Sequence, residues 1–183
     1  MAILPYLDAK DVPEEYRPLL ARGTNTERMV MHSLEGVRTY LSFGDWIRFK
    51  SRLDPRLREM VILQVGYLLK NEYVVGHHIK ISRGFGVADA DLRAIMDETA
   101  GLDTRLPLSE AAALRATREM VQDRRLSKQT TTDILMYFNP ELLVELVLIA
   151  GFYTFADLFL GTLCVDVEDS FKPYLAEMPF EIA

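Results

Sequence analysis

The chain has 183 residues, of which 49% are apolar and 26% are charged, and its formal net charge at pH 7 is −6. This length allows one domain with a sizeable core, and we expect residues 1–183 to form a single domain. The negative charge argues against nucleic-acid binding, which requires an excess of Lys and Arg to neutralise phosphates. Cys164 is the single cysteine, so no intramolecular disulfide can form, and we expect a cytoplasmic protein.

Neither a signal peptide nor a membrane partner is expected. The first residues, MAILPYLDAKDVPEEYR, lack a basic stretch followed by an apolar run. The apolar run MVILQVGYLL is too short to cross a bilayer. Residues 142–163 are long enough, but Glu145 and Asp157 within them would be costly to place in lipid. We therefore expect buried helices in an oligomeric protein.

The beginning of the chain predicts an extended arm over residues 1–24, with one helical turn at PEEYRPLL. The arm contains several helix-breaking residues, namely Pro5, Pro13, Pro18 and Gly23. Asn25 or Thr26 is expected to cap a helix that runs to about residue 37. A short apolar helix is expected to follow at TYLSFGDWIRF.

The clearest helix start lies at Asp54 and Pro55. Asp54 is a favoured N-cap residue, and the missing N–H of Pro55 costs nothing at the first helical position. Residues 60–69 are apolar on nearly every face, which indicates a helix buried on all sides. Asn71 is expected to cap the next helix, at about residues 72–83.

The second half predicts further helices. Gly84 or Gly86 can end the helix that begins after Asn71, because glycine readily adopts the left-handed conformation. We expect Ser109, Ser127 and Asn139 to cap later helices, of which the last is long and buried. The predicted segments are ADADLRAIMD, LSEAAALRATREMVQDRR, SKQTTTDILMYF and NPELLVELVLIAGFYTFADLFLGTL, followed by an irregular tail.

These patterns predict an all-α fold, since alternation with a period of two residues and Asn-Gly or Asp-Gly hairpin signals are absent. REMVILQVG (58–66) and VELVLIAGF (144–152) are similar, because in each a Glu precedes an apolar helix that carries a Gly. This similarity suggests a degenerate internal repeat, although nine residues can also match by chance.

Three ionisable residues, Glu72, His77 and His78, lie within one stretch of seven residues. Adjacent helical side chains diverge by about 100°, so we expect His77 and His78 not to share a pocket and at most one of them to be functional. Glu72 and His78 are about 120° apart, yet their long side chains could converge at the helix start. A metal site is not expected, because an HExxH pattern is absent and His32 is distant in sequence.

Glu59, Tyr73 and Cys164 each allow two interpretations. Glu59 can be a solvent-exposed carboxylate favoured by the helix dipole, or a partly buried one held ionised by Arg56 and Arg58. Tyr73 can be a phenolic donor in a pocket or an aromatic residue on a helix face. Cys164 has no neighbouring His or Lys to activate it, so we expect a buried, inert thiol.

The segment LDPRLREMVILQVGYLLKNEYVVGHHIKISRGFGV (53–87) resembles the core motif of the carboxymuconolactone decarboxylase family, which includes AhpD-like proteins. The flanks fit loosely, through the proline-containing arm and the Glu-Leu-x-x-x-x-Gly-x-Tyr pattern at 145–153. The resemblance implies an AhpD-like helical bundle and a homo-oligomer, either a dimer, a trimer or a hexamer.

The resemblance also implies roles for individual residues. Glu59 and His78 match the relay glutamate and the histidine of the thiol-bearing branch, which favours His78 over His77. Glu72 and Tyr73 match the Glu-Tyr pair of the thiol-free branch. The positions of the redox cysteines are occupied by Asn71 and Val74, so disulfide-linked peroxide reduction is not expected. Where the family usually has an aromatic residue this chain has Val75, which would reshape the pocket.

We therefore expect a cofactor-independent acid/base enzyme, a lyase resembling carboxymuconolactone decarboxylase, that acts on a small unsaturated carbonyl, lactone or carboxylic acid. His78 is expected to shuttle a proton, with Glu72 and Glu59 orienting it, and Tyr73, Val75 and His77 are expected to contact the substrate. The alternatives are a non-catalytic helical oligomer that binds a ligand or partner, and an AhpD-like peroxidase.

Overall fold

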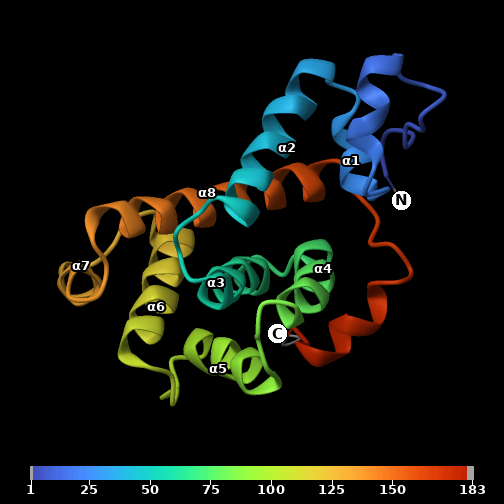
Figure 1. Cartoon of the computed structure of the whole chain (residues 1–183). Helices are drawn as coiled ribbons and strands as arrows, with labels where there is room; N and C mark the ends of the chain where they lie inside the picture. The colour runs from blue at the N-terminus through green and yellow to red at the C-terminus, as the bar shows by residue number, and fades with distance from the viewer. Residues whose placement is uncertain (1, 181–183) are drawn as a thin grey trace.

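A computed structural model describes residues 2–180, and all regular elements of this part of the chain are helical (Figure 1). The predicted all-α fold is confirmed. In chain order the elements are the 3₁₀ helix η1 (Glu14–Leu20), α1 (Asn25–Val30), α2 (Leu34–Phe49), α3 (Pro55–Leu68), α4 (Glu72–Arg83), α5 (Asp89–Thr99), α6 (Leu108–Asp123), α7 (Lys128–Leu135), α8 (Pro140–Thr162) and the 3₁₀ helix η2 (Lys172–Glu177).

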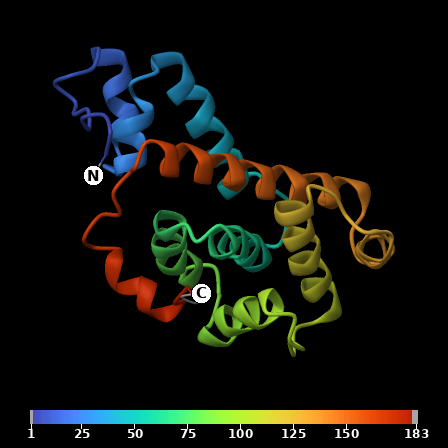
Figure 2. The ribbon, with the colours of Figure 1, turned by 180° about the vertical axis from the view of Figure 1, so that it is seen from behind.

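Helix α3 lies at the centre of the fold and packs against α4, α5, α6 and α8. Its residues 57–66 are all buried, so the burial predicted for residues 60–69 is confirmed up to Gly66, whereas residues 67–69 are only partly buried. Figures 1 and 2 show α8 passing between α2 on one side and the α3–α4 pair on the other. One part of the core fills the space between α3, α6 and α8, and a second fills the space between α3, α4 and α5.

Several helix starts are as the sequence predicts. The Asp54 carboxylate accepts a hydrogen bond of 2.9 Å from the Leu57 amide, at the start of α3. The Asn71 side chain accepts one of 2.9 Å from the Val74 amide, at the start of α4. Ser127 and Asn139 cap α7 and α8 in the same way. These caps satisfy amides that have no partner within the first turn.

Two other helix starts differ from the prediction. The helix expected over residues 25–37 is divided, because α1 ends at Val30 and Ser33 caps the start of α2. Thr24 rather than Asn25 or Thr26 caps α1, since its hydroxyl and the Glu27 side chain form a reciprocal capping box. Ser109 lies inside the first turn of α6, which follows Pro107, so it is not a cap.

Two glycines allow close approaches to α4. A Cβ atom on Gly66 of α3 would lie 2.9 Å from Cγ1 of Val74, so the glycine lets α3 and α4 pack closely. A Cβ atom on Gly76 would lie 3.2 Å from the backbone oxygen of Phe171. The space beside Gly76 is therefore filled by the C-terminal segment.

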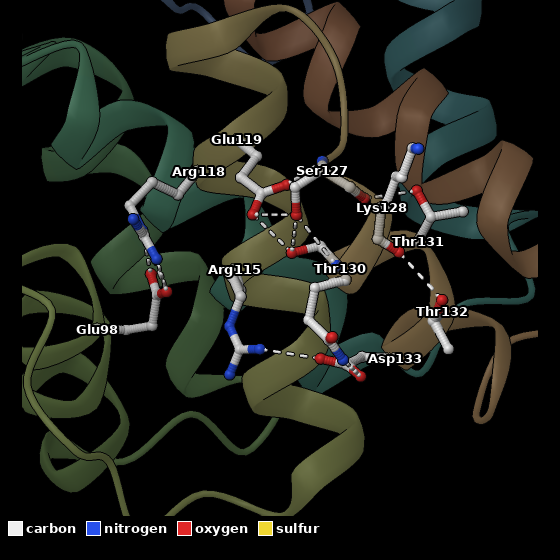
Figure 3. A network of polar contacts seen from close by, with 11 residues as sticks. Glu98, Arg115, Arg118, Glu119, Ser127, Lys128, Thr130, Thr131, Thr132 and Asp133 are labelled. Carbon is white, nitrogen blue, oxygen red and sulfur yellow. Dashed lines mark hydrogen bonds and ion pairs between the residues drawn. The ribbon is translucent and has the colours of Figure 1, made fainter.

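Polar contacts join α5, α6 and α7 (Figure 3). Arg118 of α6 forms an ion pair of 2.9 Å with Glu98 of α5. Glu119 of α6 accepts hydrogen bonds of 2.6 Å from the Ser127 amide and from the Thr130 hydroxyl, at the start of α7. These contacts hold α7 at the end of the molecule.

Helix α8 is less buried than its sequence predicts. It is the one helix of residues 2–180 that is long and apolar enough to cross a membrane, and 33% of its most apolar window is buried within the chain. Its exposed apolar side chains are Val144, Val147, Leu148, Phe155 and Leu158. The expectation of a fully buried helix is wrong for the single chain, because no residue of the described range 2–180 covers this face.

Candidate active site

A cavity of about 170 Å³ lies between α2, α3, α4 and α8, next to α1. An empty cavity of about 150 Å³ in another protein is large enough to bind benzene, so this one can hold a molecule with a single ring. Its apolar wall includes Ile47, Ile62, Val74, Phe152 and Leu160. Its polar lining includes Thr26, Glu27, Arg48, Glu59, Tyr73, His77, His78 and Tyr153.

Glu59 and His78 form a hydrogen-bonded pair in the wall of this cavity. Nδ1 of His78 lies 2.8 Å from Oε2 of Glu59, and the side chain of Glu59 is only 2% exposed. Helix α3 supplies the glutamate, and α4 supplies the histidine. The close packing of α3 on α4 therefore brings together two residues that are nineteen positions apart in sequence.

Arg58 compensates the buried charge of Glu59. Its guanidinium lies 3.2 Å from Oε1 of Glu59 and donates a hydrogen bond of 3.0 Å to the backbone oxygen of Arg48. Its guanidinium carbon also lies 4.7 Å from the centre of the Phe85 ring. Burial alone would raise the pKa of Glu59, but the hydrogen bond from His78 and the nearby charges of His78 and Arg58 outweigh it and lower this pKa.

The ionised Glu59 determines which tautomer of His78 the site favours. A carboxylate can only accept, so the neutral imidazole carries its proton on Nδ1. The other ring nitrogen, Nε2, makes no hydrogen bond to any residue in the described part of the chain. A neutral His78 thus presents an unprotonated nitrogen that can accept a proton.

His77 also lines this cavity, so the expectation that the adjacent histidines cannot share a pocket is wrong. The part of α4 that lines the cavity extends from Tyr73 to Ile81 and includes both histidines. Nε2 of His77 lies 2.6 Å from Oε2 of Glu168, and its ring stacks between Tyr73 at 4.3 Å and Phe171 at 3.7 Å. His77 therefore connects α4 to the segment after α8.

Tyr73 belongs to the same contact network. Its hydroxyl donates a hydrogen bond of 3.0 Å to Glu168 and accepts one of 3.2 Å from the Thr26 amide. The Asn25 amide donates a further hydrogen bond of 2.6 Å to Glu168. Burial would raise the pKa of Glu168, but the hydrogen bonds from His77 and Asn25 outweigh it and bring this pKa to about 2.

Glu72 and Val75 do not lie at this cavity, contrary to the prediction. Glu72 is exposed in the first turn of α4 and lines a separate surface hollow with Lys70 and Cys164. The helical rotation between Glu72 and His78 is too large for their side chains to converge. Val75 is fully buried in the core between α3 and α5.

Cys164 is exposed at the end of α8, so the prediction of a buried thiol is wrong. It follows the last residues of α8 with a positive φ of 51°, which turns the chain out of the helix. It does not line the cavity that contains His78. Within residues 2–180, there is no group of three or more His, Cys, Asp or Glu side chains that could hold a metal ion.

Sequence reasoning missed Glu168 and the cavity-lining role of Tyr153 and Arg48. Glu168 lies ninety-one positions from His77, in an irregular segment without a recognisable motif. Tyr153 falls in the Gly-x-Tyr pattern of the resemblance, so a signal for it was present. The ring of Tyr153 meets His78 edge-on, with 4.9 Å between ring centres and 89° between planes.

Solved structures define the class of fold. A peroxidase-related protein from Ralstonia eutropha, described as an alkylhydroperoxidase AhpD core, is 15% identical, with a TM-score of 0.79 and 98% of each chain covered. A cysteine-to-alanine variant of the debrominase Bmp8, in complex with 2,3,4-tribromopyrrole, is 14% identical, with a TM-score of 0.81 over 97% of this chain and 100% of that one. A peroxidase-related protein from Silicibacter sp. is 14% identical, with a TM-score of 0.75 over 93% and 94% of the two chains. The protein therefore has the AhpD-like helical fold.

The family follows from the sequence. Residues 35–119 match the model of the carboxymuconolactone decarboxylase family. The resemblance inferred from residues 53–87 is thus confirmed. No curated protein matches the chain. The matched region contains Glu59 and both histidines of the cavity, and it contains no cysteine.

The depressed pKa of Glu168 predicts how its contribution to stability depends on pH. A carboxyl group whose pKa is lower in the folded than in the unfolded state stabilises the fold fully above the unfolded value, here 4.5. This stabilisation is lost as the pH falls toward about 2. We expect Glu168→Gln to lower the free energy of unfolding by about 1–3 kcal/mol at pH 7, and the difference to shrink from pH 5 downward.

Urea denaturation of both proteins between pH 2 and pH 7 measures this difference. Glu141→Gln is the matched control, because Glu141 forms an exposed ion pair with Arg52 and no other side-chain hydrogen bond or ion pair within residues 2–180, and such pairs contribute little. A decrease in the free energy of unfolding of Glu168→Gln that stays constant from pH 2 to pH 7 would contradict the account of this carboxylate.

Proposed function

We propose that this protein is an acid/base enzyme of the carboxymuconolactone decarboxylase type, which acts on a small unsaturated carbonyl, lactone or carboxylic acid. The observation that carries the proposal is the Glu59–His78 pair, with its 2.8 Å hydrogen bond, in the wall of a cavity that can hold a single ring. Such a pair can move a proton near neutral pH without a cofactor.

His78 is the proton carrier in this proposal. Nε2 removes a proton from the substrate, and the carboxylate of Glu59 stabilises the imidazolium that forms, as a carboxylate does in other His-dependent sites. The imidazolium then returns the proton at a different atom. In a decarboxylation, the electron pair of the broken C–C bond moves into the conjugated carbonyl as CO₂ leaves, and the proton of His78 is delivered to carbon.

The position of Glu72 changes the assignment of roles. Glu72 is outside the cavity, so Glu59 alone is proposed to orient His78. Because the contacts with His78 and Arg58 lower the pKa of Glu59 and keep it ionised, we assign Glu59 to stabilising the imidazolium rather than to carrying protons itself.

The size and lining of the cavity are consistent with a small organic substrate. The debrominase with the same fold is bound to 2,3,4-tribromopyrrole, a ligand with one small ring. A peroxidase of the AhpD type is disfavoured, because Asn71 and Val74 cannot form a redox disulfide and Cys164 lies away from the cavity. The cavity is also compatible with a protein that binds a ligand without turnover, and activity distinguishes the two functions.

The proposal predicts that His78→Gln lowers the rate of proton transfer by about 10² or more, because general acid/base catalysis contributes at least this factor. The wild-type protein is incubated in D₂O with a panel of small lactones and unsaturated keto acids. NMR then follows deuterium incorporation and loss of CO₂.

His32→Gln is the matched control, since His32 is exposed and bonds only to the backbone oxygen of Pro5. It should keep the wild-type rate. If His78→Gln turns over the same compound as fast as the wild type, the acid/base role is refuted.

We also propose that the protein forms a homo-oligomer through the exposed apolar face of α8. A hollow of about 720 Å³ separates this face from α2, and its lining includes Phe43, Val147, Leu148, Phe155 and Phe159. Exposed apolar surfaces of this kind in soluble proteins usually mark an interaction site. A second copy of the chain would remove these side chains from water.

This proposal predicts that the wild type sediments at a multiple of 20.9 kDa, and that Leu148→Glu shifts the mass toward one chain. A charge buried in an apolar interface lacks a partner and is costly. Arg93→Glu places the same residue on the exposed face of α5 and should leave the mass unchanged. A wild-type protein that is monomeric at micromolar concentration would refute the proposal.

A further inference from the structure

Tyr153 lies in the wall of the cavity beside His78, and its hydroxyl has no assigned role. Its hydroxyl makes no hydrogen bond with any residue of the described range 2–180. It is not among the fully buried, unpartnered polar atoms of these residues, so a water-sized molecule can reach it. A phenolic hydroxyl that can be reached and that no residue engages can donate a hydrogen bond to a ligand.

The other tyrosines of the cavity differ from Tyr153. The hydroxyl of Tyr73 is already engaged by Thr26 and Glu168, so it is not free to bind a substrate. Tyr40 packs its ring against Phe152 at 5.2 Å and Phe159 at 6.0 Å, but it makes no ring contact with His78. Of these three tyrosines, Tyr153 is the one whose ring contacts His78.

The surroundings of Tyr153 keep it in the form that donates. Burial raises the pKa of Tyr153 well above its ordinary value, and the negative charge of Glu59 adds to this effect. The phenol therefore keeps its proton at neutral pH. A neutral hydroxyl in a site of low polarity is a strong donor to an oxygen that gains negative charge.

We propose that the hydroxyl of Tyr153 donates a hydrogen bond to the substrate oxygen that becomes an enolate, while Nε2 of His78 exchanges the proton at a carbon of the same conjugated system. This inference rests on the proposed function and narrows its substrate class. The substrate is a single-ring or similarly small conjugated molecule whose carbonyl oxygen lies at Tyr153. The edge-on contact, with 4.9 Å between ring centres, places the Tyr153 side chain next to that of His78.

The test uses 4-nitrophenolate and nitrobenzene as probes, because they share a ring and a nitro group and differ in the charge-bearing oxygen. Calorimetric titration gives the dissociation constant of each probe for the wild type, Tyr153→Phe and Tyr137→Phe. Tyr137 is exposed, lies just after α7 and does not line the cavity, which makes it the matched control.

We expect the wild type to bind 4-nitrophenolate more tightly than nitrobenzene. Tyr153→Phe should raise the dissociation constant of 4-nitrophenolate about 10-fold or more, since a hydrogen bond to a charged group is lost. It should change the dissociation constant of nitrobenzene less than twofold. Tyr137→Phe should change neither. A wild type that does not prefer 4-nitrophenolate would overturn the inference. If Tyr153→Phe weakens the binding of both probes equally, or weakens the binding of neither, the inference is also overturned.

The turnover of His78→Gln separates this inference from the proposed function. Suppose that Tyr153→Phe has reduced affinity for 4-nitrophenolate alone while His78→Gln retains full turnover. The acid/base function then fails, but the hydroxyl of Tyr153 still binds an oxyanion. If His78→Gln loses turnover while Tyr153→Phe binds both probes as the wild type does, only the role of Tyr153 fails.

Discussion

The buried carboxylate of Glu59 is the constraint on which the site depends. A charge that is 2% exposed needs compensation, and it receives this from Arg58 on one oxygen and from His78 on the other. The contact with His78 requires α4 to lie close against α3, which Gly66 permits. The same pair of helices contributes to the hydrophobic core. The position of the candidate base is therefore set by interactions that also stabilise the fold.

The two histidines of the cavity have different functions in this account. Both are bonded to a glutamate, but His77 is held between Tyr73 and Phe171 and fastens α4 to the segment after α8. His78 has a nitrogen left for a substrate. The His77–Glu168 pair and the His78–Glu59 pair therefore differ in their surroundings. One pair holds the segment after α8 in place, and the other is the pair proposed to transfer a proton, beside the ring of Tyr153.

Local signals made much of the fold predictable. Asp54 with Pro55, and Asn71, mark helix starts through short-range hydrogen bonds, so α3 and α4 follow from the sequence. The resemblance paired Glu59 with His78, which the structure places in contact. The expectations for Glu72 and Val75 failed because the motif does not show where the cavity lies around α4. Glu168 could not be found, since its contact with His77 depends on the path of an irregular segment.

The central claim is that Glu59 fixes His78 in the tautomer whose Nε2 is free to accept a proton. The most direct measurement is the ¹⁵N NMR spectrum of the His78 ring at a pH where the imidazole is neutral, recorded for the wild type and Glu59→Gln. The account predicts a protonated Nδ1 and an unprotonated Nε2 in the wild type, and a mixture of tautomers in the variant. A wild-type His78 that carries its proton on Nε2 would contradict the claim.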